Sequence, residues 1–576
     1  MDKKIIKPTS EQMRAIRLAQ KGADMGLVAC AGAGKTSTLH MIALEMIPKT
    51  GMYLAYNKEI ALEAREKFRG LPVHVSTLHS LAYRNMIGEG KTYSKERLER
   101  FPLSSYVIAQ ALGKDTGIEL FSDIKGLDEY GFDDHAKFMG PGDIGRLVLE
   151  TIKAYCNSGD HLLNKSHVSA GARIRITKAA LIAAAKRKEG ETKGIGIVPG
   201  ESYLDMLCWV EEDRLATYVE GLAKDVWADL ENPKGELPIT HDVYLKKYAN
   251  DLLLGHIQPP NVDYIMLDEF QDSNGVTISL AEAMQAKGSQ IIAVGDPNQQ
   301  IYDWRGSINA FDRMPFSSMA LLSTSFRFGP RIAAVVSQFV DRHIQPGFHI
   351  RGSRNIDSTL SRLDAPSAVI CRTNAGIVEV LIREIMHGRK PKSPRVQNLV
   401  SMIRSIEQLK AGRTPEHPEL KPFKTYEELE EFAIADPESQ FDNYFNLIKR
   451  YGAAKLIHTL EETSRTAVPD VIVMTGHGSK GLEWENVRLH DDFSNTPNRV
   501  GKDKSMARLL YVAATRATDV LDVCDVGEMS EMADNVSMMG TQELEFYTEP
   551  ADKQKVVRRK REGLEFAMAA QTDDGR

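Results

Sequence analysis

The segment ACAGAGKT at residues 29–36 constrains the fold of this chain more than any other part of the sequence. It follows a short apolar run at 26–29 and precedes a helical pattern at 37–46. A strand, a loop of small residues and a helix in this order form a P-loop, in which backbone N–H groups and the helix N-terminus bind phosphate. The first position is Ala29 where the strict pattern has glycine. A small-residue turn before a core helix is therefore the alternative interpretation.

A P-loop gives its residues specific roles. Lys35 would reach the β- and γ-phosphates of a nucleoside triphosphate, and the Thr36 hydroxyl would coordinate Mg²⁺. Other contacts would come from the loop backbone. We therefore expect nucleotide contacts from Ala31, Gly32, Ala33, Gly34, Lys35, Thr36 and Ser37.

Two acidic residues, Asp268 and Glu269, follow a second apolar run at 264–267. A strand that ends in two acids can place a metal ligand beside a base that activates water. We expect Asp268 to hold Mg²⁺ through its water shell and Glu269 to orient and deprotonate the attacking water. A surface turn is the alternative interpretation, and the P-loop upstream argues against it.

Short apolar runs alternate with longer helical patterns along the chain. The runs are rich in Val, Ile and Leu, which is typical of parallel strands buried on both faces of an α/β sheet. They lie at 26–29, 52–55, 264–267, 291–294, 368–371, 471–474 and 520–523. Because they form two clusters, we expect two α/β domains. The stretches 86–255 and 386–465 resemble helical insertions, and the first contains helical patterns at 174–188 and 203–229.

Composition excludes several classes of protein. Hydrophobic residues make up 42% of the 576 residues, which supplies several cores and rules out wholesale disorder. The 73 Lys and Arg against 79 Asp and Glu give a net charge of −6, which argues against coating DNA by bulk charge but is compatible with a local basic groove. No stretch approaches the ~20 apolar residues of a membrane span. The five cysteines are far apart, which argues against disulfides or a cysteine metal cluster and for a reducing intracellular compartment.

Eight further segments complete an ordered series of motifs across both expected α/β domains. They are PTSEQ (8–12), AYNK (55–58), TLHS (77–80), GDPNQQIYDWRG (295–306), SFRFG (325–329), RTN (372–374), TGHGSKGLEW (475–484) and YVAATRA (511–517). Together with the P-loop and the DEFQD segment at 268–272, the series resembles the superfamily 1 helicases of the UvrD/Rep type. The resemblance implies an α/β fold of two RecA-like P-loop domains with parallel sheets, each carrying a mainly helical insertion.

The same resemblance implies domain boundaries. We assign RecA-like domain 1A to 1–85 and 256–312, insertion 1B to 86–255, domain 2A to 313–385 and 466–550, a reduced insertion 2B to 386–465, and a polar tail to 551–576. The second insertion is short for a UvrD/Rep protein. An acidic pair that the family commonly has just before the last motif is replaced by Ser505 and Met506.

In UvrD/Rep helicases the first motif and the SFRFG segment hold the base of ATP. By resemblance Gln12 would pair with adenine, Phe326 would stack on it and Glu483 would bind the ribose. A Gln amide suits adenine because it is a donor and an acceptor at once. A helix N-terminal capping cluster with Ser10 is the alternative interpretation of the first motif.

The resemblance also implies three groups that act on the γ-phosphate. Gln299 would sense it, and Arg327 and Arg516 would reach it from the second α/β domain as arginine fingers, each worth ~10³–10⁵ in rate. A structural salt bridge is the alternative role for either arginine.

Nucleic-acid contacts are expected from residues that follow strands or present flat aromatic faces. By resemblance they are Tyr56, Asn57, Thr77, His79, Tyr302, Trp304, Arg372, Asn374 and His477. Aromatic faces stack on bases regardless of sequence. For His79, and for the pair Tyr302 and Trp304, packing in the core is the alternative interpretation.

A narrower resemblance points to the F-box DNA helicases. It rests on PITHDVYLK at 238–246, on the SFRFG segment and on DDF at 491–493. We expect no F-box-like region before the motor, because the first motif begins at residue 8 of this sequence. The ubiquitin-ligase side of that branch is therefore not expected.

The function expected from this resemblance is an ATP-dependent DNA helicase that moves 3′→5′ on single-stranded DNA and unwinds duplexes in replication, recombination or repair. ATP and Mg²⁺ would be its cofactors. Single-stranded and duplex DNA would be its partners, with recombination or replication proteins as further candidates. We expect a monomer without membrane association, in the cytoplasm or on a prokaryotic or viral nucleoid, with a nuclear location left open.

Two alternatives to a helicase stay open, and a third is discounted. The first is a translocase that strips proteins from single strands with little unwinding. The second is an ATP-gated DNA clamp that does not turn over. The third is a helicase–nuclease subunit, which we do not expect because the residues after the last motif are too few for a nuclease domain.

Overall fold

A computed structural model describes residues 7–55, 57–99, 103–120, 138–169, 201–301, 310–421, 423, 425–435, 441–494 and 504–549. The chain divides into two compact units. The first contains Met1–Leu78, Gln258–Leu399 and His458–Arg576, and the second contains His79–Ile257 and Val400–Ile457. Over the described ranges, no helix combines the length and apolar content needed to cross a membrane.

The first sheet has six parallel strands in the order β3-β2-β6-β7-β1-β8. Their bounds are β1 Met25–Ala29, β2 Gly51–Ala55, β3 Val73–Thr77, β6 Tyr264–Leu267, β7 Gln290–Gly295 and β8 Ser318–Leu322. The central strands β6 and β7 are buried along their whole length, as continuous apolar runs require. The strands predicted at 26–29, 52–55, 264–267 and 291–294 are confirmed.

The second sheet also has six parallel strands, in the order β11-β16-β15-β12-β14-β13. Their bounds are β11 Thr359–Leu360, β12 Ala368–Cys371, β13 Pro391–Lys392, β14 Val471–Thr475, β15 Trp484–Leu489 and β16 Ala517–Asp522. Two predicted runs match β12 and β14, and a third overlaps β16. The expected class, α/β with two parallel sheets, is confirmed.

The first sheet extends beyond residue 312, the predicted end of domain 1A. Strand β8 pairs in parallel with β1 from Met25 and Ser318 to Ala29 and Leu322. Its apolar sequence, SMALL, suits this half-buried edge position, at which Ala320 and Leu322 are buried. We call the first sheet with its packed helices the first lobe, and the second sheet with its helices the second lobe.

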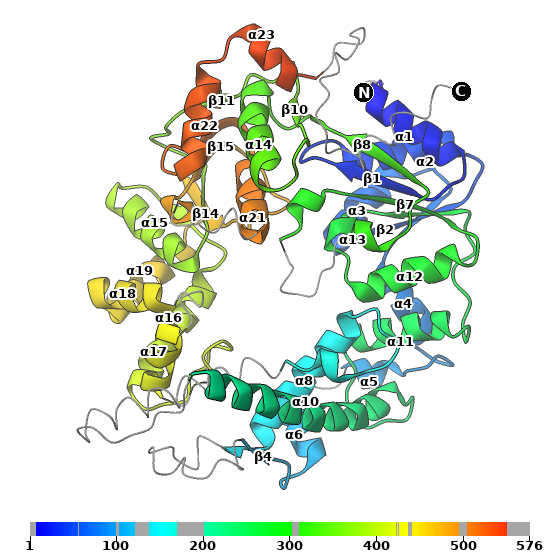
Figure 1. Ribbon diagram of the computed structural model, residues 1–576, viewed down its shortest axis with the longest axis vertical. Helices are drawn as coiled ribbons and strands as arrows, with labels where there is room; N and C mark the ends of the chain where they lie inside the picture. Colours follow the sequence, from blue (N-terminus) through cyan, green and yellow to red (C-terminus); the bar gives the residue numbers. More distant parts are fainter. Residues whose placement is uncertain are drawn as a thin grey trace. The chain divides into compact units, whose positions relative to one another are not determined.

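Helices cover both sheets (Figure 1). In the first lobe, α1 (Ser10–Gln20) packs on α2 (Lys35–Glu45) and β8, and α3 (Lys58–Lys67) packs on β2 and β3. In the second lobe, α14 (Pro330–His343) packs on α21 and α22, and α15 lies on β12 and β14. The bounds of these partner helices are α15 Asn374–Met386, α21 Lys504–Ala514 and α22 Gly527–Ser537.

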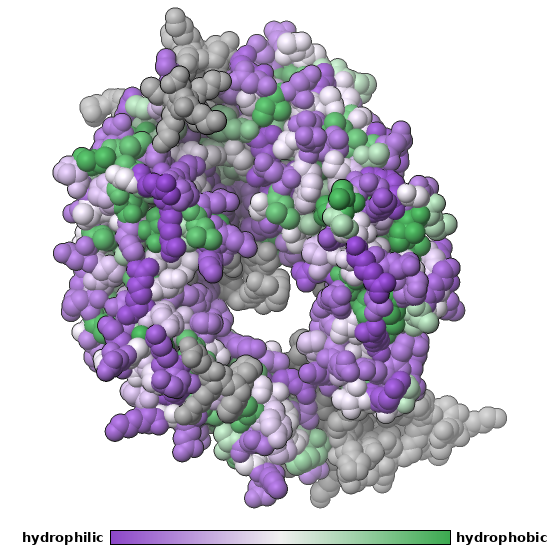
Figure 2. Space-filling view, turned by 180° about the vertical axis from the view of Figure 1, so that it is seen from behind, coloured by the Kyte–Doolittle hydropathy of each residue, from purple (hydrophilic) through white to green (hydrophobic). Residues whose placement is uncertain are grey.

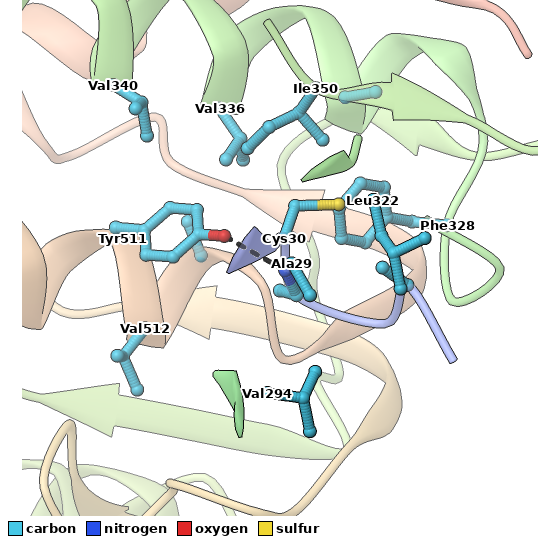
Figure 3. Packing of buried hydrophobic residues seen from close by; sticks show 14 of the residues in the cluster. Ala29, Cys30, Val294, Leu322, Phe328, Val336, Val340, Ile350, Tyr511 and Val512 are labelled. Carbon is cyan, nitrogen blue, oxygen red and sulfur yellow. Dashed lines mark hydrogen bonds between the residues drawn. The ribbon is translucent and has the colours of Figure 1, made fainter. Parts of the chain in front are cut away.

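One hydrophobic cluster runs through both lobes (Figure 3). Val294 and Leu322 contribute to it from the first lobe, and Val336, Ile350 and Tyr511 contribute from the second. The face in Figure 2 is mostly hydrophilic, with hydrophobic residues in small separate groups. Many of the apolar residues that the composition supplies lie in this buried cluster.

The second unit is mainly helical. Its helices include α4 Leu78–Met86, α5 Lys95–Glu99, α6 Ser105–Leu112, α8 Pro141–Asn157, α10 Glu201–Glu231, α11 His241–Leu253, α17 Tyr426–Ala435 and α18 Phe441–Tyr451. A short antiparallel pair, β4 (Ile118–Glu119) with β5 (Phe138–Met139), accompanies them. The pattern at 203–229 lies within α10, whereas 174–188 lies outside the described residues.

The segment PITHDVYLK at 238–246 contains the N-terminus of α11, which begins at His241. The Thr240 side chain accepts a backbone hydrogen bond and caps this helix. Lys246 is 1% exposed, and its Nζ donates to the backbone carbonyls of Ser158 (2.8 Å) and Asp160 (2.6 Å). Burial lowers the pKa of Lys246 to about 8. These contacts give the segment a structural role inside the helical unit.

Candidate functional site

The loop between β1 and α2 has the backbone of a phosphate-binding loop. Gly32 and Gly34 both have φ of 73°, a conformation that glycine adopts without strain. A Cβ at Gly32 would lie 2.6 Å from both the Ser325 Oγ and the Arg327 Cβ. Helix α2 begins at Lys35, so its N-terminus faces the loop. The expected strand, loop and helix are therefore present, and the SFRFG segment lies directly against the loop.

The two acids after β6 pair with the two polar side chains that begin α2. Lys35 Nζ lies 3.0 Å from Glu269 Oε1, and the Thr36 hydroxyl donates to Asp268 Oδ2 at 3.0 Å. Burial alone would lower the pKa of Lys35, but the charge of Glu269 and its neighbours raises it. Burial would raise the pKa of Glu269, but Lys35 and Lys480 lower it to about 2. An ammonium and a carboxylate thus hold each other in the charged form.

Asp268 and Thr36 fit a magnesium ion. Their oxygen atoms are adjacent, and Mg²⁺ prefers oxygen ligands, of which the protein usually supplies one or two. Burial raises the pKa of Asp268, a cost that a bound cation would offset. Over the described ranges, no cluster of three or more His, Cys, Asp or Glu side chains could hold a metal.

Tyr53 on β2 makes a contact in the site that the sequence motifs do not indicate. Its hydroxyl donates a hydrogen bond to Asp268 Oδ2, and the side chain is fully buried. Burial, followed by the charge of Asp268, raises the pKa of Tyr53. Tyr53 therefore acts as a donor that orients the carboxylate. The only indication of this contact in the sequence is the hydroxyl of Tyr53 within the apolar run at 52–55.

Glu269 adopts an unusual backbone conformation. Its φ is 52°, and among the described residues it is the only non-glycine with a positive φ. Residues in this region cost of order 1–3 kcal/mol and cluster at functional sites. Gln271 Nε2 donates to Glu269 Oε2 at 2.7 Å and helps to fix the carboxylate.

Asp296, just after β7, joins the two lobes. Its Oδ2 accepts hydrogen bonds from the Tyr511 hydroxyl and from Gln299 Nε2, each at 2.8 Å. The Tyr511 hydroxyl also accepts from the Ala31 N–H at 3.0 Å and points at the P-loop in Figure 3. The Asp296 N–H donates to Gln271 Oε1 at 2.9 Å. One network therefore links the P-loop, Gln299 and the partner of Glu269 to α21.

Lys480 makes a second connection between the lobes. Its Nζ donates to Asp272 Oδ1 at 2.7 Å and to the Gln299 carbonyl at 2.8 Å. The side chains of Lys480 and Asp272 are 12% and 3% exposed. The TGHGSKGLEW segment thus contacts both the DEFQD segment and the segment that carries Gln299. Asp296, Tyr511 and Lys480 were not among the predicted site residues. Each lies inside one of the sequence motifs, and that position is the signal that could have identified them.

The two expected arginine fingers lie together in the second lobe. Arg327 Nε donates to Glu483 Oε2 at 2.8 Å, and its Nη1 donates to the Thr515 carbonyl at 3.0 Å. Arg516 is 1% exposed, and its Nε donates to the Val512 carbonyl at 2.8 Å. Burial and the charge of Arg327 lower the pKa of Arg516 to about 9. Arg327 thus lies against the P-loop, whereas Arg516 is held by its own lobe; their roles stay predictions.

The residues expected at the base of ATP lie beside Gly34. A Cβ there would be 3.7 Å from both Gln12 Nε2 and the Phe326 ring, so these two side chains flank the same glycine. Phe326 is 43% exposed. Gln12 Nε2 donates to Thr38 Oγ1 at 3.1 Å, and its Oε1 accepts from the Thr9 N–H at 2.9 Å. The capping residue is Thr9, not Ser10 as expected, and its capping box includes Gln12.

The first group of expected nucleic-acid contacts follows β2 and β3. Ala55 and Thr77 are register partners at the ends of these strands, and Asn57 caps α3. His79 lies on α4, where its Nε2 is 3.3 Å from Asp242 Oδ1. It is half-exposed, which differs from the core position weighed as the alternative. Tyr56, Tyr302 and Trp304 lie outside the described residues.

The second group lies at the carboxyl edge of the second sheet. Cys371 and Thr475 are register partners, and the Gly476 N–H donates to the Cys371 carbonyl at 2.9 Å. Arg372 and His477 therefore follow neighbouring strands at one edge. Asn374 begins α15 at the same edge.

A separate cavity of about 390 Å³ lies in the second lobe. Its charged walls include Arg362, which pairs with Asp525 at 2.7 Å, and Arg389, which pairs with Glu384 at 2.7 Å. Because these charges compensate each other, the cavity indicates no particular ligand.

Comparison with known families and proteins places these motifs in context. The family model for the UvrD/REP helicase N-terminal domain matches residues 9–312, and that for the UvrD-like helicase C-terminal domain matches residues 352–524. F-box DNA helicase 1 of Gallus gallus is 26% identical over 555 residues, covering 89% of this chain and 48% of that protein. F-box DNA helicase protein 1 of Schizosaccharomyces pombe is 25% identical over 558 residues, covering 88% and 56%. The ATP-dependent DNA helicase PcrA of Bacillus subtilis is 32% identical over 82 residues, covering 13% and 11%. The chain therefore spans about half the length of the two F-box relatives.

Proposed function

This chain belongs to the UvrD/REP helicase family, and from that premise we propose that it is an ATP-dependent DNA helicase that moves 3′→5′ on single-stranded DNA. The observation that carries the proposal is the pairing of Lys35 with Glu269 and of Thr36 with Asp268 at the carboxyl ends of β1 and β6. These four side chains are the set that a P-loop ATPase needs for phosphate, metal and water.

We expect nucleotide binding to rearrange the Lys35–Glu269 pair. The Lys35 ammonium would turn to the β- and γ-phosphates, because a triphosphate carries more negative charge than one carboxylate. Glu269 would then lose its partner and accept a proton from the attacking water. Thr36 and Asp268 would hold Mg²⁺, which neutralises phosphate charge when bound. Arg327 would exchange its contact with Glu483 for the γ-phosphate.

Movement on DNA would follow from contacts between the lobes. Lys480 and Tyr511 reach the first lobe from the second through Asp272 and Asp296. A γ-phosphate that adds contacts to both lobes favours the closed arrangement, and its loss after hydrolysis removes that preference. We propose that the expected DNA contacts at the two sheet edges grip the strand alternately during this cycle.

The domain assignment follows the same proposal. Domain 1A would comprise 1–85 and 256–312 together with β8, because β8 pairs with β1. Domain 2A would contain the second sheet. The insertions 86–255 and 386–465 and the tail 551–576 keep their proposed bounds.

The decisive experiment measures phosphate release with single-stranded DNA, with single-stranded RNA and with neither. We expect DNA to stimulate turnover, and strand displacement to require a 3′ rather than a 5′ single-stranded tail. Equal turnover under all three conditions would contradict a DNA-driven motor. Turnover without any strand displacement would favour a translocase that strips bound proteins.

A further inference from the structure

The carboxylate of Asp492 lies beneath the RTN segment, at the carboxyl ends of β12 and β15. Its Oδ1 accepts a hydrogen bond from the Arg372 N–H at 2.8 Å, and its Oδ2 accepts from the Thr373 N–H at 2.9 Å. The Thr373 hydroxyl donates to the same Oδ2 at 3.0 Å. Arg372 Nε donates to the Asp492 backbone carbonyl at 3.0 Å. The side chain of Asp492 is 13% exposed, so these contacts are largely shielded from water.

These contacts satisfy backbone groups that neither the strand nor the helix can pair. Strand β12 ends at Cys371, and α15 begins at Asn374 with Thr373 as its cap. The N–H groups of Arg372 and Thr373 lie in between and need another acceptor. An ionised carboxylate that accepts two adjacent N–H groups is a strong partner and fixes the turn.

Gly376 allows the carboxylate to approach this closely. A Cβ at Gly376 would lie 2.3 Å from Asp492 Oδ2 and 3.1 Å from its Cγ. Any other residue there would displace the carboxylate from the turn. The position of the Asp492 carboxylate therefore requires glycine at residue 376.

The neighbour on the other side is a buried histidine. His490 Nδ1 lies 3.2 Å from Asp492 Oδ1. Burial would raise the pKa of Asp492, but the hydrogen bond and charge of His490 lower it. Asp491 also lies 3.2 Å from His490 Nδ1, yet its side chain is 69% exposed. Two adjacent aspartates thus differ in that Asp492 alone contacts the turn.

We propose that Asp492 is a positioning residue for single-stranded DNA, holding the Arg372–Asn374 turn in the conformation that contacts the strand. This inference rests on the proposed function, because the DNA contacts of Arg372 and Asn374 are themselves proposed. The opposite possibility is that Asp492 occupies, at the N-terminus of α15, a place that a DNA phosphate would otherwise take. The two possibilities predict opposite changes in DNA affinity when the Asp492 carboxylate is removed. Affinity falls if Asp492 positions the turn, and it rises if Asp492 competes with a DNA phosphate.

The test compares Asp492→Asn with Asp491→Asn, a matched change at the adjacent exposed residue. The probe is a single-stranded oligodeoxythymidylate, and the readouts are its direct binding and its concentration for half-maximal stimulation of ATP turnover. We expect Asp492→Asn to raise the Kd for the oligonucleotide and the half-maximal concentration about tenfold, which corresponds to the loss of one charge-assisted hydrogen bond. The KM for ATP without DNA should equal that of the unaltered chain. Asp491→Asn should change neither constant. Unchanged or tighter DNA binding by Asp492→Asn would overturn the inference.

Two further measurements keep the test informative if Asp492→Asn folds poorly. Gly376→Ala should weaken DNA binding in the same direction, because it displaces the carboxylate without removing it. In the unaltered chain, the amides of Arg372 and Thr373 should exchange slowly with solvent both with and without the oligonucleotide. Fast exchange without DNA would contradict a preformed turn. Loss of DNA stimulation in the unaltered chain would instead contradict the proposed function.

Discussion

Lys35 Nζ lies 3.0 Å from Glu269 Oε1, so the cation expected to bind phosphate is paired with the carboxylate expected to activate water. The first prediction concerns Glu269→Gln. The variant should bind ATP but lose at least ~10²-fold in turnover, because the amide cannot accept the proton. Nucleotide binding and phosphate release should be measured together. Glu63→Gln, at an exposed position on α3, is the matched control and should turn over normally. Sustained hydrolysis by Glu269→Gln would remove Glu269 from the mechanism.

The second prediction concerns pH. Lys35 and Lys480 overcome burial and lower the pKa of Glu269 to about 2, below the ordinary value of about 4.3. A carboxylate whose pKa is lower in the folded protein stabilises the fold above its ordinary pKa, and this contribution disappears as the pH falls towards the folded value. The stability difference between the unaltered chain and Glu269→Gln should therefore be constant from pH 7 to about 5 and shrink below about 4.3. Denaturant unfolding at a series of pH values measures it, and a difference that grows on acidification would contradict the pairing.

The third prediction concerns Tyr511→Phe. This change removes only a hydroxyl, but it leaves the Ala31 N–H and one contact of Asp296 without their partner. Such a loss should cost about 1–3 kcal/mol in the free energy of unfolding, and turnover should fall because Asp296 also holds Gln299. Tyr264→Phe is the matched control, because its buried hydroxyl has no hydrogen-bond partner among the described residues. Equal stabilities of the two variants would show that the network contributes nothing.

The sequence predicts most of the apolar strands, though not β8, and it predicts the polar contacts poorly. Strands such as β6 are continuous apolar runs, and both their burial and their parallel pairing follow from that pattern. Strand β15 (WENVRL) was missed because only alternate positions near its end are buried, so it contains no apolar run. Motif order places Lys35 and Glu269 after the carboxyl ends of two strands of one sheet, β1 and β6, which flank β7. By contrast, the contact between Ala31 and Tyr511 joins residues 480 positions apart, and no local pattern encodes it.

The fourth prediction concerns the arginine finger. Arg327→Lys keeps the charge but loses the planar donor fork, so ATP turnover should fall by up to ~10³-fold while ATP binding changes little. The variant should be assayed in single-turnover reactions, which separate chemistry from product release. Arg331→Lys on α14 is the control, because its Nη1 donates only a long bond of 3.5 Å to the Val536 carbonyl. Unchanged single-turnover rates for Arg327→Lys would leave Arg327 with the structural salt bridge to Glu483.

The last prediction concerns the base of the nucleotide. Phe326 is 43% exposed beside Gly34, while its N–H donates to the Gly32 carbonyl at 2.9 Å and fixes the backbone independently of the ring. Phe326→Ala should therefore remove a stacking surface without moving the loop. Stacking of a base on an aromatic ring is worth about 1–3 kcal/mol, so ATP should bind about tenfold more weakly.

Inorganic tripolyphosphate, which has no base, should bind the variant as well as it binds the unaltered chain. Competition titrations with both ligands make this comparison, and Phe546→Ala, at an exposed position, is the control. An equal loss of affinity for both ligands would mean that Phe326 supports the phosphate loop rather than the adenine.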